Sequence, residues 1–106
     1  MEKSKLSVIQ GLRVVDAVLA ENGAGIIFEN GINLAIYNKY ELIGFSFTET
    51  QQLIGHFVTH VDEDINTIMI RFENSWALQV DMQNDAYTGP EAMQLCVPGK
   101  PIVIWN

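Results

Sequence analysis

The sequence predicts a mostly β fold of the α+β class, in which two repeated three-stranded antiparallel meanders pack as a small sandwich or partly open barrel. The first observation behind this prediction is an internal repeat, because residues 9–38 align on residues 53–82 without a gap. The second is the alternation of apolar and polar side chains within each copy, which is typical of half-buried strands. With 106 residues and 48% hydrophobic content, we expect residues 1–106 to form a single domain around one core.

The repeat relates residues that lie 44 positions apart in the chain. The identical pairs include Gly11/Gly55, Val14/Val58, Asn22/Asn66, Phe28/Phe72 and Leu34/Leu78. Similarity at a fixed offset indicates a duplicated structural unit. We therefore expect Phe28 and Phe72 to occupy equivalent buried sites at the ends of matching strands.

Each copy is predicted to form three strands in succession. The expected strands are 12–19, 24–28 and 32–36 in the first copy, and 57–61, 68–72 and 76–82 in the second. Asn30 and Gly31 provide the two positive φ values of a type I′ turn between the last two strands of the first copy. Asn74 and Ser75 take the same place in the second copy.

Short helices are expected where the sequence shows capping signals. Thr48-Glu49-Thr50-Gln51 matches a capping box and predicts a helix that ends near Gly55, and Ser4 has the equivalent place ahead of Gly11. Thr88-Gly89-Pro90-Glu91 matches a second capping box and predicts a turn or two of helix through Leu95. The final apolar run, 102–105, predicts a central strand or one buried on both faces.

Charge is unevenly distributed along the chain. Thirteen acidic residues against six basic ones give a formal net charge of −7, and the segment from Asp62 to Glu91 holds seven acids and one base, Arg71. Such a surface repels nucleic acid and anionic lipid and speeds association with a basic protein. The alternative is that the acidity serves only solubility.

No residue pattern predicts catalysis or a resident metal or cofactor. His56 and His60 have the spacing of a zinc-binding helix, but they fall on a predicted strand, where four residues span about 13 Å. Asp62-Glu63-Asp64 lacks the glycine and the final glutamate of a calcium loop. Cys96 has no histidine near it in sequence and is expected to be a structural thiol. We therefore expect no enzyme, no metal and no cofactor.

The sequence also lacks the features of a signal peptide and of a membrane span, and its one cysteine cannot form an internal disulfide. These observations predict a cytoplasmic protein. The partner-binding surface is expected in the acidic second half of the chain, where Tyr87 could act as an aromatic anchor. The alternative is that Tyr87 and Met93 fill the core, while Pro90 and Glu91 only shape the start of a helix. The residues that we expect to bind the partner are Asp62, Glu63, Asp64, Asp81, Asp85, Tyr87 and Glu91.

The C-terminal tail has a distinctive pattern, D-A-Y-x-G-P-E-A-M-Q-L-x-V-P-G-K-P-I-V-I-W-N, over residues 85–106. It resembles the end of a group of small acidic bacterial proteins, some of which are immunity proteins of contact-dependent growth inhibition and related polymorphic toxin systems. The resemblance implies a protein that binds and neutralises a cognate basic toxin, such as a nuclease, by blocking its active-site cleft. It implies no particular binding residue. Three alternatives stay open: a domain that binds a small ligand between its meanders, a subunit of a larger assembly, and a small hydrolase.

Overall fold

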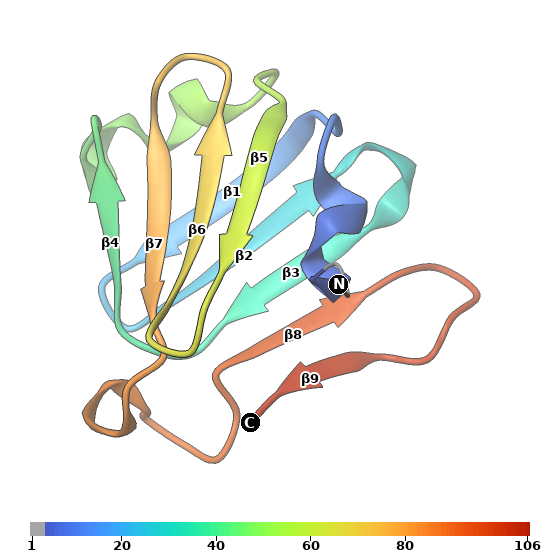
Figure 1. Cartoon of the computed structure of the whole chain (residues 1–106). Coiled ribbons are helices and arrows are strands. Elements are labelled where there is room, and N and C mark those ends of the chain that lie inside the picture. Colours follow the sequence, from blue (N-terminus) through green and yellow to red (C-terminus); the bar gives the residue numbers. More distant parts are fainter. Residues whose placement is uncertain (1–3) are drawn as a thin grey trace.

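The computed structural model describes residues 4–106 and shows two antiparallel sheets packed around a shared core (Figure 1). The five-stranded sheet has the order β1 (Val14–Ala20), β2 (Gly23–Phe28), β3 (Asn33–Ile36), β8 (Met93–Cys96) and β9 (Val103–Trp105). The four-stranded sheet has the order β4 (Tyr40–Ile43), β7 (Ala77–Asp81), β6 (Thr67–Phe72) and β5 (Val58–Glu63). The helical segments are short 3₁₀ turns, η1 (Lys5–Ile9), η2 (Glu29–Gly31), η3 (Phe47–Leu53) and η4 (Asn84–Ala86). This architecture confirms the predicted fold class, and the sheets do not close into a barrel.

The two meanders, β1–β2–β3 and β5–β6–β7, are joined by hydrogen bonds that repeat at equivalent positions. The Gly11 N–H donates to the Val58 carbonyl at 2.7 Å, and the Gly55 N–H donates to the Val14 carbonyl at 2.8 Å. Both glycines have positive φ angles, and the first strand of each meander carries a bulge at the same place. Reciprocal contacts of this kind place an approximate twofold axis between the meanders.

The meanders exchange their fourth strands. β4 follows β3 in the chain but pairs with β7, and β8 follows β7 but pairs with β3. Tyr40 pairs with Val80, and Met93 pairs with Ile36. Ile36 and Val80 correspond in the repeat, so Tyr40 and Met93 have equivalent places in this exchange. The exchange links the two sheets, and it brings the β3–β4 connection to the end of β7.

The prediction of a helix from Thr88 to Leu95 is wrong. Residues 88–90 form bends, and Met93–Cys96 is the strand β8. Met93 and Leu95 point into the core and are at most 1% exposed. Their spacing of two residues is the period of a strand. The Thr88 hydroxyl donates to the Tyr37 carbonyl at 3.0 Å instead of capping a helix. Pairing with the open edge of β3 outweighs the local capping signal.

Two further predictions need correction. The helix η3 is capped by Ser46 rather than Thr48, since the Glu49 carboxylate accepts the Ser46 N–H at 2.9 Å. The last strand, β9, lies at the edge of the five-stranded sheet, and Ile102 and Ile104 are 54% and 45% exposed. It is therefore neither central nor buried on both faces.

The core between the sheets is mostly apolar. Phe28 and Phe72 end the matching strands β2 and β6 with exposures of 0% and 2%, which confirms the expected equivalence. Asn30 and Gly31 have the predicted positive φ values, although the turn they form has three residues, Glu29–Gly31. In the second copy Ser75 alone has a positive φ.

Candidate functional site

Seven of the thirteen acidic residues gather at one end of the sandwich, which we call the acidic end. The end consists of the β5–β6 turn, the end of β7, η4, the β1–β2 turn and the start of β4, in the lower part of Figure 1. Three surface hollows of about 1020, 490 and 480 Å³ adjoin there, because the first and third share Ile65 and the second and third share Gln83. Their acidic lining residues are Glu21, Glu41, Asp62, Glu63, Asp64, Asp81 and Asp85.

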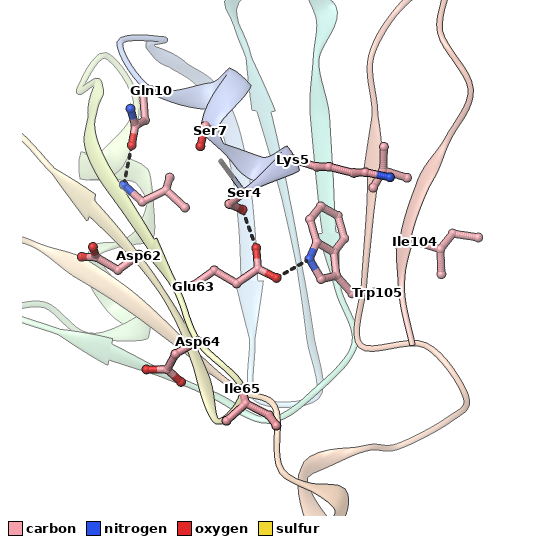
Figure 2. Close-up of a pocket in the computed structure, with 12 residues that line it drawn as sticks. Ser4, Lys5, Ser7, Gln10, Asp62, Glu63, Asp64, Ile65, Ile104 and Trp105 are labelled. Carbon is pink, nitrogen blue, oxygen red and sulfur yellow. Dashed lines mark hydrogen bonds between the residues drawn. The ribbon is translucent and has the colours of Figure 1, made fainter. Parts of the chain in front are cut away.

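The largest hollow lies between η1, the end of β5 and β9 (Figure 2). Glu63 extends across it, accepts the Trp105 indole N–H at 3.1 Å with one carboxylate oxygen, and accepts the Ser4 hydroxyl with the other. Ser4 in turn caps η1 by accepting the Leu6 N–H at 3.1 Å. Glu63 therefore connects three elements, and both of its oxygens have partners within the chain.

Asp62 is on the outer face of β5, on the opposite side of the strand from Glu63. Its side chain is 55% exposed and lies 3.2 Å from His60 Nε2 and 3.6 Å from Arg71 Nε. One oxygen faces each of these basic groups, so that the charge of Asp62 is partly balanced. Exposed pairs of this kind contribute little to stability and can exchange partners.

Asp64 begins the β5–β6 turn and is fully ionised at neutral pH. Its Oδ1 accepts the N–H groups of Asn66 and Thr67 at 2.7 and 2.8 Å, and these bonds hold the pKa of the carboxyl below its usual value. Ile65, next in the turn, is 88% exposed. The tip of the hairpin thus presents an apolar side chain beside fixed negative charge.

Asp81 ends β7, which pairs with β6 on the side away from β5, and Asp85 lies in η4. Asp81 accepts the Gln83 N–H at 2.9 Å, whereas the exposed Asp85 lines the third hollow together with Ile65. Within residues 4–106, Lys5 and Lys39 are the only basic residues that line the three hollows. The acidic end therefore keeps a strong excess of negative charge.

Sequence reasoning missed Glu21 and Glu41, because both belong to the first half of the chain. They line the second hollow with Asp81 and Lys39. Their proximity depends on the strand exchange, which carries β4 to the edge of β7. The repeat alignment ended before this strand, and no other sequence signal marked it.

The structure does not place Tyr87 and Glu91 in the three hollows. Tyr87 is half-buried against the core, and its hydroxyl donates to the Asn106 carbonyl at 2.7 Å. Glu91 is half-buried in the connection that leads into β8. Ile65 is thus the large apolar side chain that the acidic end exposes most fully.

The histidines and the cysteine lie apart from one another. His56 precedes β5 with its Nδ1 3.0 Å from Glu73 Oε1, while His60 is within β5 beside Asp62. Cys96 is half-buried in β8, and its sulfur lies 3.7 Å from Gln94 Nε2. In the described part of the chain, no three His, Cys, Asp or Glu side chains are arranged to hold a metal ion.

Comparisons of the chain with protein-family models, with curated proteins and with solved structures found no match. Among residues 4–106, no helix is long and apolar enough to cross a membrane.

Proposed function

We propose that the chain is an immunity protein that binds a cognate basic toxin through its acidic end and neutralises it. The observation that carries the proposal is the gathering of seven carboxylates, drawn from both halves of the chain, around three adjoining hollows. The resemblance of residues 85–106 to immunity proteins supports the same role. The partner is thus a protein rather than nucleic acid or a membrane.

The charges of the acidic end act together on an approaching partner. Neighbouring charges within a Debye length of about 8 Å at physiological salt add their potentials, and a hollow surface focuses the field. A basic protein would be drawn to this end and oriented by it. Association would be fast at low salt and slower at high salt, while dissociation would change less.

The residues of the acidic end divide into two roles. Asp85 is exposed and holds no other element in place, so its charge is free to meet a basic partner, whereas the exposed Asp62 would exchange its contacts with His60 and Arg71 for that partner. Glu63 and Asp64 instead maintain the shape of the site, one by joining η1 to β9 and the other by closing the turn. Ile65 would add apolar contact area once the charged groups have aligned.

A nuclease is the toxin class that this surface suits best. Nuclease clefts are basic and attract the phosphates of their substrate. A group of carboxylates can bind in such a cleft in place of those phosphates. Blocking the cleft requires no reaction by the inhibitor. The proposed protein therefore binds without turnover.

The experiment is co-expression with the protein encoded by the adjacent gene, followed by affinity capture and binding kinetics. We expect a complex whose association rate falls as salt rises from about 0.05 to 0.5 M. Glu41→Lys with Asp85→Lys should slow association. Glu29→Lys with Glu73→Lys, at the opposite end of the sandwich, changes the net charge equally, from −7 to −3, and is the matched control.

If both double variants reduce the association rate equally, net charge alone explains the effect and the acidic end is not the binding site. If no complex forms with the adjacent gene product, the immunity role is contradicted.

A further inference from the structure

The outer face of the five-stranded sheet is almost without charge. Within residues 4–106, the five strands of this sheet contain one charged residue, Asp16, which lies on the edge strand β1. The face exposes apolar side chains, with Val18, Ile27 and Ile104 at 68%, 42% and 45% exposure. Gly25 and Ala35 lie between them on β2 and β3, so the middle of the face is shallow.

The second sheet provides an internal comparison, because the duplication gives it the same positions. Val18 corresponds to Asp62, and Ile27 corresponds to Arg71, in the repeat at 44 positions. Its four strands contain Glu41, Asp62, Glu63, Arg71 and Asp81. The fold therefore accepts charged residues on an outer face, and the apolar face of the five-stranded sheet is not a requirement of the architecture.

Tyr37, Gln94 and Asp16 in this face have partners within the chain. The Tyr37 hydroxyl donates to Gln94 Oε1 at 3.1 Å, and Gln94 Nε2 lies 3.7 Å from the Cys96 sulfur. Asp16 Oδ1 accepts the Ala17 N–H at 2.9 Å. Covering polar groups that already have partners costs much less than covering unpartnered ones. The face can therefore be buried against another protein surface.

We infer that this face binds the same face of a second copy of the chain. Two copies with a charge of −7 each repel one another, and this repulsion opposes their contact least where both contacting surfaces lack charge. The outer face of the five-stranded sheet meets this condition, and a twofold dimer places it against itself. A basic partner would gain no electrostatic attraction at this face.

The size of the face indicates a weak dimer. Five strands about 4.8 Å apart, with three to seven residues each, present roughly 400 Å² per copy, below the area of standard stable interfaces. Association should therefore depend on protein concentration. The face and the acidic end share Ile104, which lines the first hollow, whereas the second and third hollows, with Glu41 and Asp85, lie outside the face and stay open in a dimer.

The test is sedimentation velocity of the purified chain from about 10 to 1000 µM, a range chosen for a weak interface. The wild-type mass should rise from 11.9 kDa toward twice that value. Added salt should strengthen the dimer by screening the repulsion between copies, whereas it should weaken toxin binding. This opposite salt dependence separates the dimer from the proposed function.

The decisive variant transfers the charge pair of the second sheet to the first, as Val18→Asp with Ile27→Arg. It leaves the net charge at −7 and should keep the mass at 11.9 kDa at every concentration. Gln51→Asp with Gln52→Arg, in the exposed part of η3, makes the same changes elsewhere and should behave as wild type. If the double variant loses its circular dichroism spectrum, Ala35→Arg replaces it with the same expectation.

A wild-type mass that stays at 11.9 kDa over the whole range would overturn the inference. A folded Val18→Asp, Ile27→Arg variant that still dimerises like wild type would overturn it as well, because the contact would then lie on another surface.

Discussion

Replacing Phe28 or Phe72 by alanine should destabilise the protein strongly and by similar amounts. Both side chains end matching strands and are 0% and 2% exposed. Removing a buried phenylalanine side chain costs about 3–5 kcal/mol, from a total of about 5–15 kcal/mol for a domain of this kind. With a urea m-value of about 1.5 kcal/mol/M, the unfolding midpoint should fall by about 2 M or more.

Urea unfolding followed by tryptophan fluorescence measures the effect, because the chain has two tryptophans. Phe47→Ala is the matched control: this phenylalanine is 40% exposed, and its replacement should cost about 1 kcal/mol or less. Phe28 and Phe72 are not equivalent core residues if either buried variant loses less than about 1 kcal/mol, or if the two losses differ by more than about 2 kcal/mol.

Three other changes test individual features of the structure. Gly44→Ala should destabilise more than Gly55→Ala in thermal melts, by about 1 kcal/mol or more: both glycines have positive φ, but only at Gly44 would a Cβ lie 3.0 Å from an indole ring. Asp64→Asn should flatten the acid limb of the stability curve; the folded-state pKa of Asp64 is lowered, so its stabilisation is present above the unfolded pKa of about 3.9 and is lost as pH falls through the folded value. Glu63→Ala should release Trp105 from its hydrogen bond, shift its fluorescence to longer wavelength and raise amide exchange in β9.

The repeat made much of the fold predictable. Identical residues at a fixed offset located both meanders, and the period-two alternation located their strands to within a few residues. The equivalence of Phe28 and Phe72 followed from the same alignment. These features are local or depend on neighbouring strands, so their signals lie in short stretches of sequence.

The exchanged strands could not be predicted for a physical reason. β4 and β8 pair with strands of the other meander, and such pairing leaves no trace in a local window. Ahead of β8 the local signals predict a helix that begins at Thr88. Residues 93–96 instead form a strand that pairs with the edge of β3. Tertiary pairing overrode local propensity there.

The acidic site was predictable in part. The charge-rich segment from Asp62 to Glu91 is visible in the sequence. The structure places five of its seven acids at one end, whereas Glu73 lies at the opposite end and Glu91 in the connection that leads into β8. The contributions of Glu21 and Glu41 depend on the strand exchange and could not be foreseen. The sequence left two places open for Tyr87, an exposed anchor or the core, and the structure packs it against the core with its hydroxyl donating to the Asn106 carbonyl.

The most direct test of the proposed function is the survival of cells that express the adjacent toxin gene together with this chain or its variants. We expect wild type and Glu29→Lys with Glu73→Lys to protect, and Glu41→Lys with Asp85→Lys to lose protection at equal expression. Because both pairs of substitutions change the net charge equally, the difference reports the place of the charge. Full protection by Glu41→Lys with Asp85→Lys would contradict the claim that the acidic end binds the toxin.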